Sequence, residues 1–452
     1  MAEILLLNPP GRKMYLRDSY CSKVSKSSYL YHPVDLLVQW GQLSKQGHEI
    51  QFLDCIEENL SVKETISKIK ILSPEIIYGL SGFVSFKEDV YFYRELSKNI
   101  DSEIYLGGDL FLNCDKTLFS SFNMASGFIC DFTTPEFGEY LNNRNKKINS
   151  MFKPPEFFKT TPYKGGERSF GILDWEKLKN KNYSYPFSVN AKLATVLTSS
   201  GCNYNCDFCV SGNFPLSYRP IEELMEEFRI LKNLGYREIY FADQTFNFNK
   251  KRTIDLLEKM ISEKFNFSWS AFVRIENLDK ELLELFKLAN CHTLIFGIEA
   301  GDFDRRKRYG KNVEDQIYIE KIKLMNNVGI RSVGTFIIGL PDETMKTAIK
   351  SVNFAIKASL DFVSFNIAIP RPLTKITKES RWEKFDVADQ SSGELHFLDI
   401  AEELKGNGGM KFINTGNREF YMRPSYLLQR LVKIKSLHQF KNELIQGFNL
   451  IF

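Results

Sequence analysis

Apolar runs alternate with amphipathic stretches over the first third of the chain. Five runs have the length of buried strands, at residues 4–7, 49–54, 76–80, 103–106 and 127–132. Three of the stretches between them place apolar side chains three or four positions apart, at residues 33–46, 61–72 and 90–99. The alternation predicts an α/β fold, with residues 1–141 as a doubly wound, Rossmann-like parallel sheet. A ligand of such a sheet binds at the carboxyl ends of its strands.

Small residues end two of these predicted strands. Ser81 and Gly82 follow the third run, and Gly107 and Gly108 follow the fourth. Small side chains let a large flat cofactor or a phosphate-bearing group approach the backbone closely. The same glycines are equally consistent with plain turns, so both interpretations stay open.

A second alternation of strands and helices runs over residues 191–372. Six strand candidates lie at residues 194–198, 238–241, 267–274, 293–297, 332–338 and 362–369. The stretches between them have apolar side chains at helical spacing, such as Leu224, Phe228 and Leu231. Six units predict a partial (β/α)6 barrel, because the closed barrel of this class has eight. Chemistry is expected at the carboxyl ends of these strands.

A connector and a C-terminal segment lie outside the two patterns. Residues 142–190 contain Pro154, Pro155 and an aromatic stretch at 183–187, and we expect this connector to be packed. Residues 373–452 are expected to form a mostly helical segment, with an irregular charged stretch at 379–398, a turn at 406–409 and one or two helices over 420–452.

An apolar stripe runs along the last predicted helices, formed by Leu427, Leu431, Ile434 and Leu437 beside Arg430. One interpretation is a helix packed on the barrel by this stripe, with its basic side in solvent. The other is a cap whose basic side binds an anionic or lipid-like molecule. The sequence leaves both open.

Composition is that of an ordinary globular protein, with 43% apolar and 26% charged residues. The 60 Lys and Arg against 56 Asp and Glu give a net charge of +4, so no nucleic-acid partner is expected. No apolar run approaches the ~20 residues of a membrane span, and the first residues do not resemble a signal peptide. We therefore expect a cytoplasmic protein. Five scattered cysteines, expected to be free buried thiols, agree with a reducing compartment: Cys21, Cys55, Cys114, Cys130 and Cys291.

The other three cysteines stand together after the first predicted barrel strand. Cys202, Cys206 and Cys209 have the spacing Cys-x3-Cys-x2-Cys, with Phe208 before the last. With no fourth Cys or His nearby, they cannot close a tetrahedral zinc site. They suit a cubane iron–sulfur cluster, in which three irons take one cysteine each and the fourth iron is left for another ligand. Gly201 favours the tight turn that this arrangement needs.

This motif resembles that of the radical S-adenosylmethionine (SAM) enzymes, including the aromatic residue before the last cysteine. The resemblance implies a [4Fe-4S] cluster on Cys202, Cys206 and Cys209 whose open iron chelates the methionine part of SAM. One electron from the cluster would cleave SAM to methionine and a 5′-deoxyadenosyl radical, which takes a hydrogen atom from an unactivated carbon. It also implies an electron donor, such as a reductase or a flavodoxin-type protein.

The resemblance further implies that residues near the cluster and at the ends of the barrel strands bind SAM. They are Phe208, Asp243, Gln244, Arg274, Gly297, Glu299, Ile337 and Gly339. By residue type alone, Asp243 is equally a helix N-cap. Arg274 either grips a carboxylate or pairs with a neighbouring loop.

The N-terminal half resembles the cobalamin-binding domain of the cobalamin-dependent (class B) radical SAM enzymes. The stretches Leu-Asn-Pro-Pro at 7–10 and Tyr-His-Pro-Val-Asp-Leu-Leu at 31–37 carry this resemblance. It assigns cobalamin, as methylcobalamin, to Ser81, Gly82, Gly107 and Gly108. The Asp-x-His-x-x-Gly loop that offers a histidine to cobalt is absent, so we expect cobalt without a His ligand. His32 and His48 are expected at the surface.

Together these resemblances predict a cobalamin-dependent radical SAM methyltransferase that methylates an unactivated carbon of a small-molecule or lipid-like substrate. Tyr421, Arg423 and Tyr426 are the candidate substrate residues, and peripheral membrane contact is compatible with the tail. One rival keeps the cofactors but performs a non-methylating rearrangement or cyclisation. Another is an iron–sulfur electron-transfer or structural protein. Methylthio transfer is disfavoured, because the remaining cysteines are scattered and no small basic β-barrel follows.

Overall fold

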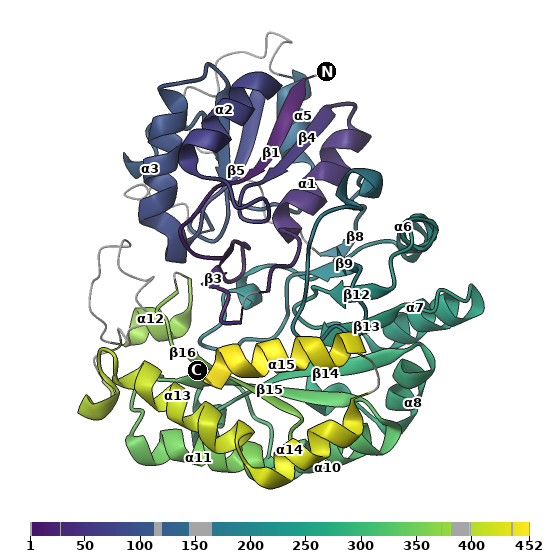
Figure 1. Ribbon diagram of the computed structural model, residues 1–452, viewed down its shortest axis with the longest axis vertical. Helices are drawn as coiled ribbons and strands as arrows, with labels where there is room; N and C mark the ends of the chain where they lie inside the picture. The colour runs from purple at the N-terminus through teal and green to yellow at the C-terminus, as the bar shows by residue number, and fades with distance from the viewer. Residues whose placement is uncertain are drawn as a thin grey trace.

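The computed structural model of the chain describes residues 2–27, 29–112, 120–143, 165–371, 373–380, 397, 399–434 and 437–451. Within these ranges it has two parallel sheets, with the N-terminal one above the larger C-terminal one in Figure 1. Pro154, Pro155, Cys114 and most of the charged stretch at 379–398 lie outside the described residues.

The N-terminal sheet is doubly wound, as predicted. Its strands are β1 (Glu3–Asn8), β4 (Glu49–Asp54), β5 (Ile76–Leu80), β6 (Glu103–Gly107) and β7 (Gly127–Ile129), in the order β4-β1-β5-β6-β7. Ile4 and Leu6 share one core with α1 (Val34–Lys45) and α5 (Glu136–Asn143). Leu5 and Leu7 share the other with α2 (Val62–Leu72) and α3 (Phe86–Ser97). The strand order is that of flavodoxin-like folds, whose ligands bind at the carboxyl ends.

Two boundaries in this half differ from the prediction. The helix expected over 90–99 begins earlier, at Phe86, and the last strand ends at Ile129 instead of residue 132. The long stretch between β1 and α1 contains a two-stranded ribbon, β2 (Tyr15–Leu16) and β3 (Lys23–Val24), which the sequence did not predict. This ribbon lies between the two sheets (Figure 1).

The second sheet is the predicted open barrel of six parallel strands. These are β9 (Leu193–Val196), β12 (Glu238–Phe241), β13 (Ser268–Phe272), β14 (Cys291–Glu299), β15 (Arg331–Ile338) and β16 (Phe362–Ile367). They follow one another in chain order, so β9 and β16 are the edges. The intervening helices are α6 (Ile221–Asn233), α7 (Lys250–Ser262), α8 (Lys280–Leu288), α9 (Phe303–Arg308), α10 (Asp315–Val328) and α11 (Met345–Lys357).

Aromatic side chains from the connector pack between the two halves, as expected. Tyr183 and Tyr185 are buried, and the Tyr185 ring stacks on that of Tyr240 with centroids 4.0 Å apart. They share a core with Leu197, Ile295 and other barrel residues and with the N-terminal stretch that leads into α1. The described part of the connector is therefore part of the interface between the sheets.

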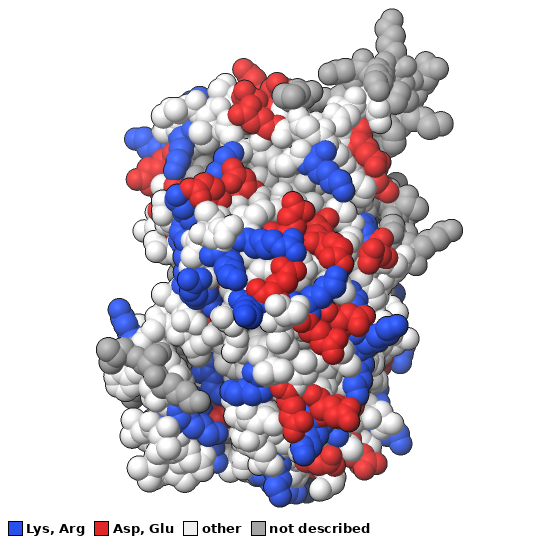
Figure 2. All heavy atoms as spheres, turned by 90° about the vertical axis from the view of Figure 1, so that its right-hand side faces the viewer, with Lys and Arg blue, Asp and Glu red and all other residues white. Residues whose placement is uncertain are grey.

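The face that carries α6, α7 and α8 has charges of both signs. Figure 2 shows Lys and Arg interspersed with Asp and Glu there. Several are paired, for example Arg229 with Glu263 at 2.8 Å between nitrogen and oxygen. This face therefore presents no continuous basic surface for a nucleic acid.

Two helices of the C-terminal segment, α14 (Pro424–Lys433) and α15 (Leu437–Ile451), lie where one or two were expected. The short helix α12 (Lys375–Glu379) and the longer α13 (Gly408–Tyr421) precede them. α13 begins at Gly408, inside the expected turn, and packs on β16 and α11. No helix in the described part of the chain is long and apolar enough to cross a bilayer.

The first interpretation of α14, a helix packed on the barrel by its apolar stripe, is wrong. Leu427 and Leu431 of the apolar stripe are 45% and 62% exposed, whereas Arg430 is buried. Arg430 turns inward because it pairs with the buried carboxylate of Asp361 and the partly buried one of Glu443. An unpaired buried charge costs more free energy than an exposed leucine side chain, so the ion pairs decide the orientation.

Candidate active site

The three motif cysteines lie in a loop after β9, at the carboxyl end of the barrel. β10 (Ser199–Ser200) pairs with β11 (Ser217–Tyr218) and closes this loop at its base. Gly201 has a φ of +80°, and a Cβ atom there would lie 2.4 Å from the carbonyl oxygen of Pro215. The loop therefore needs glycine next to Cys202, as the sequence indicated.

Asp243 fixes the start of the cysteine loop. Its buried carboxylate accepts hydrogen bonds from the backbone N–H of Thr198 at 2.7 Å and from Ser199 Oγ at 2.7 Å. The N-cap of α7 is Asn249, so the alternative role of Asp243 as a helix cap is wrong. Burial raises the pKa of Asp243, and the hydrogen bonds from Thr198 and Ser199 oppose the rise.

Two cations lie beside Cys206. Burial raises the pKa of its thiol, and the nearby charges of Lys311 and Arg274 only partly oppose the rise. Arg274 Nη1 lies 3.6 Å from Cys206 Sγ. Because the thiolate is the form that binds metal, the two cations assist ligation.

The donor set fits a cluster better than a single ion. Cys202 is buried, and Cys206 and Cys209 are partly exposed. Among the described residues, no three His, Cys, Asp or Glu side chains are grouped so that they could hold one metal ion. A cubane cluster needs a different arrangement of ligands, because each of three irons binds a single thiolate.

Arg274 is held by groups of the chain itself. Its Nε donates to Glu276 Oε1 at 2.7 Å, and its guanidinium carbon lies 4.1 Å from the centroid of the Tyr204 ring, in the cysteine loop. The ion pair is thus made within the same loop after β13, and not with a neighbouring loop. A role in gripping the SAM carboxylate stays a prediction.

Glu299 and Lys311 form a buried pair beside the cysteine loop. Lys311 Nζ donates to Glu299 Oε1 at 2.9 Å. Glu299 follows a bulge in β14 and has a φ of +68°, a backbone conformation that is strained for glutamate. A Cβ atom on Gly297 would lie 1.8 Å from that carboxylate oxygen, which explains why position 297 is glycine.

The sequence did not single out Lys311. Gly310 brings it to the site, because Gly310 packs so closely on Asn205 that a Cβ atom would lie 2.6 Å from the Asn205 carbonyl oxygen. A glycine directly before an isolated lysine was the available signal. It carries little information without the distant segment it contacts.

The other predicted SAM residues lie at the same end of the barrel. Phe208 and Ile337 are half-buried. Gly339 has a φ of +89°, and its N–H donates to Glu343 Oε2 at 3.2 Å. The buried Oε1 atom of Gln244 has no hydrogen-bond partner within the described part of the chain, so it is available to a ligand.

The N-terminal glycines are packed against protein atoms. The Gly82 N–H and the Ser81 hydroxyl both donate to Asp89, at 3.1 and 2.9 Å. A Cβ atom on Gly107 would lie 2.3 Å from Tyr78 Oη, and one on Gly108 would lie 2.0 Å from the Ser81 carbonyl oxygen. These four residues shape the ends of β5 and β6, and a direct contact with cobalamin stays a prediction.

The ends of the N-terminal strands face the cysteine loop across a thin layer of side chains. The Gly201 N–H donates to Tyr20 Oη at 3.2 Å. A cavity of about 10 Å³ lies between the end of β7, at Cys130 to Thr133, and the loop residues Ser200, Phe214 and Pro215. The carboxyl ends of both sheets thus meet at one place.

Comparison with known proteins identifies the barrel. Residues 196–355 match the family model described as the radical SAM superfamily. The chain is a radical SAM enzyme. Over 422 residues it is 26% identical to an uncharacterized methyltransferase of Pyrococcus horikoshii, covering 87% of this chain and 88% of the relative. An alignment of 474 positions, 21% identical, relates it to the anaerobic magnesium-protoporphyrin IX monomethyl ester cyclase of Rubrivivax gelatinosus, covering 97% and 82%.

A solved structure shares the fold of this radical SAM enzyme. The radical SAM methyltransferase TsrM from Kitasatospora setae, solved with cobalamin and a [4Fe-4S] cluster bound, matches with a TM-score of 0.62 at 15% identity. The match covers 83% of this chain and 74% of TsrM. The two-part α/β architecture expected from the sequence is therefore confirmed.

The expected surface positions of two histidines are wrong in this radical SAM enzyme. His32 is buried, with Nδ1 3.2 Å from Thr195 Oγ1, and burial alone lowers its pKa to about 3. His48 is buried too. Cys21, expected to be buried, is instead exposed. For His32 the prediction failed because the barrel covers the start of α1 through Thr195, which local sequence does not show.

The three candidate substrate residues of this enzyme are not at the cluster. Tyr421 Oη donates to the Val363 carbonyl oxygen at 2.7 Å, and Tyr426 Oη donates to that of Asp361 at 2.9 Å. Both contacts are at the amino end of β16, opposite the cysteine loop. Arg423 lies over the Phe420 ring, 4.6 Å from its centroid. The structure thus gives these side chains packing roles at the barrel edge.

Proposed function

We propose that this radical SAM enzyme is a cobalamin-dependent methyltransferase, which methylates an unactivated carbon of a small-molecule or lipid-like substrate. One observation carries the proposal: the carboxyl ends of a flavodoxin-like sheet and of a radical SAM barrel meet at the cysteine loop. Ligands of both sheet types bind at these ends. Two cofactors held there would therefore be adjacent.

The chain's own residues hold and orient the cofactors. Cys202, Cys206 and Cys209 would ligate the cluster, and Lys311 and Arg274 would supply positive charge beside it. Gln244 would offer its unpartnered oxygen to SAM. When bound, the cluster and SAM supply a carbon-centred radical, and cobalamin supplies the methyl group.

The cavity of about 10 Å³ between the two sheets is far smaller than a corrin ring. The proposal therefore includes movement of side chains that line it, among them Tyr20, when cobalamin binds. Four of the five histidines are described, namely His32, His48, His292 and His438, and none of them lines this cavity. The proposal therefore includes cobalt without a ligand from these histidines.

Anaerobic reconstitution tests the proposal. The protein is incubated with iron, sulfide and hydroxocobalamin, freed of unbound cofactor and examined by absorbance spectroscopy. We expect a cluster and one cobalamin per chain. Cys206→Ala should lose the cluster and keep cobalamin, because the two sites use different residues. A wild-type protein with a cluster and no retained cobalamin would contradict the proposal.

A non-methylating cyclisation is the second candidate function. The relative from Rubrivivax gelatinosus is a cyclase, and its alignment spans nearly the whole of this chain. Isotope-labelled SAM separates the two, because methylation moves the labelled carbon into the product and cyclisation does not. For either reaction we propose a cytoplasmic enzyme that receives electrons from a reductase or a flavodoxin-type protein.

A further inference from the structure

Exposed apolar side chains are concentrated on the last two helices. The described part of the chain has thirteen large apolar side chains that are exposed, and nine lie within the last thirty or so residues. They are Met422, Leu427, Leu428, Leu431, Val432, Phe440, Leu444, Ile445 and Phe448. The other four are dispersed over α2, α3, α8 and α11. We call the nine residues the C-terminal apolar face.

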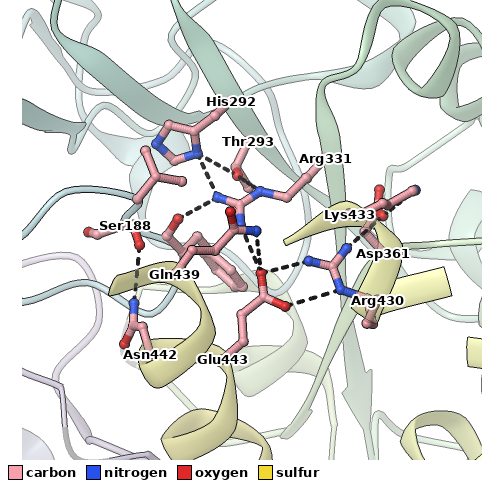
Figure 3. Close-up of polar contacts among 12 residues, drawn as sticks. Ser188, His292, Thr293, Arg331, Asp361, Arg430, Lys433, Gln439, Asn442 and Glu443 are labelled. Carbon is pink, nitrogen blue, oxygen red and sulfur yellow. Dashed lines mark hydrogen bonds and ion pairs between the residues drawn. The ribbon is translucent and has the colours of Figure 1, made fainter. Parts of the chain in front are cut away.

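Polar contacts hold the opposite sides of α14 and α15 on the barrel (Figure 3). The Glu443 carboxylate accepts hydrogen bonds from Arg430 Nη2 at 2.7 Å, Arg331 Nη1 at 3.2 Å and Gln439 Nε2 at 2.8 Å. Arg430 Nη1 also donates to Asp361 Oδ1 at 3.0 Å. These charges are largely buried, so turning either helix over would break several ion pairs.

A second contact fixes α15 at its other side. Asn442 Nδ2 donates to the carbonyl oxygen of Pro186 at 3.1 Å and to that of Ser188 at 3.3 Å, in the connector that leads into β9. The polar side chains of α15 therefore have hydrogen-bond partners at the amino end of the barrel. Its apolar side is left facing away from the protein, the reverse of an ordinary surface helix.

The charges around this face are cationic. α14 and α15 contain one acidic residue, Glu443, which the barrel-side arginines already neutralise. Lys441 is exposed, and so is Lys433, whose Nζ also pairs with Asp361 Oδ1 at 2.7 Å. In a symmetric dimer the same patch meets itself, so these cations would meet without acidic partners from either helix. A bilayer with anionic lipids supplies both an apolar layer and negative charge.

We propose that the C-terminal apolar face docks on a membrane surface that contains anionic lipids. Helices with an apolar side and nearby cations bind there by burying the apolar side among the headgroups. The surface lies at the amino end of the barrel strands, whereas the cysteine loop lies at their carboxyl ends. Docking would therefore keep the cysteine loop on the side away from the membrane. The proposal uses no residue of the cofactor sites, and its failure would leave the proposed methyltransferase function untouched.

Vesicle sedimentation with the full chain tests this docking. We expect binding to vesicles of phosphatidylcholine mixed with phosphatidylglycerol, and much weaker binding to phosphatidylcholine alone. The variant Leu431→Gln/Val432→Gln/Phe448→Gln should bind about tenfold more weakly. Ile71→Gln is the matched control, because Ile71 is 84% exposed but lies on α2, and it should bind like the wild type.

Other outcomes would overturn the proposal. One is wild-type protein that does not sediment with anionic vesicles, and another is a triple variant that binds them as well as wild type. A wild-type dimer that becomes monomeric in the triple variant would instead assign the face to a second copy. If circular dichroism shows that the triple variant is misfolded, Lys441→Glu replaces it in the test. This variant should also weaken binding to anionic vesicles.

Discussion

Arg371 donates a hydrogen bond to Asp109, which precedes it by 262 positions, and joins the two halves of the enzyme. Arg371 follows β16, and Asp109 follows β6. Arg371 Nη2 also donates to the Ser22 carbonyl oxygen at 2.8 Å, and Ser22 in turn donates to Asp109. Burial raises the pKa of Asp109, and the charge of Arg371 opposes the rise. This buried pair fixes one sheet relative to the other.

Replacing Arg371 by methionine should destabilise the enzyme by about 3–5 kcal/mol, because Asp109 is then buried without its cation. The free energy of unfolding from urea titrations measures the effect. Asp109→Asn combined with Arg371→Met should recover part of the loss. Arg308→Met is the matched control, since its ion pair with Asp342 is exposed, and it should change the free energy by less than about 1 kcal/mol.

Cys206→Ala should abolish the visible absorbance of the reconstituted cluster and the cleavage of SAM, because one of three iron ligands is lost. Formation of 5′-deoxyadenosine under reducing conditions measures cleavage. Cys21→Ala is the control: Cys21 is exposed and outside the motif, so cluster and cleavage should be unchanged. Cleavage that persists in Cys206→Ala would refute the assignment of the cluster to this loop.

Lys311→Met should slow SAM cleavage about tenfold or more, because it removes a cation beside Cys206 and leaves Glu299 buried without its partner. Burial lowers the pKa of Lys311, but Glu299, Tyr318 and Cys206 together raise it by more, so the lysine is charged. The rate of 5′-deoxyadenosine formation measures the effect. Lys307→Met, at an exposed position in α9, should match wild type. Equal rates in both variants would show that Lys311 only fills space.

His32 should make the enzyme less stable as the pH falls. Its pKa is about 3 in the folded chain and about 6.5 when unfolded, so between these values only the unfolded chain takes up the proton. From about pH 7 to pH 5 this costs roughly 2 kcal/mol. His32→Gln should remove that part of the pH dependence of the free energy of unfolding.

The control for the pH experiment is His438→Gln, at an exposed position on α15. It should leave the dependence on pH as in wild type. If His32→Gln and wild type lose stability in parallel between these pH values, the buried neutral state of His32 is contradicted.

Much of the fold could be predicted because its signals are local. A buried strand between two helices needs only its own apolar residues to be recognised, and the six barrel strands all lie within a few residues of their predicted positions. Errors fell at ends, such as Phe86 in α3, where side chains from other segments extend or cut an element.

The site was predictable to the extent that its ligands are neighbours in the chain. Cys202, Cys206 and Cys209 lie within eight positions, so their spacing alone restricts the metal chemistry. Lys311 is over a hundred positions from Cys206, and only packing of Gly310 on Asn205 brings it there. Its role depends on a contact that no local pattern records.

The sequence by itself determined the strand–helix alternation, the cysteine loop and the need for glycine at position 201. Those properties depend on steric rules and spacings within a few residues. Only the tertiary structure decided that Arg371 meets Asp109, that His32 is buried, and that α14 turns Arg430 inward and its leucines outward. The reason is that the free energy of a charge depends on its partner and on burial, and both are supplied by distant parts of the chain.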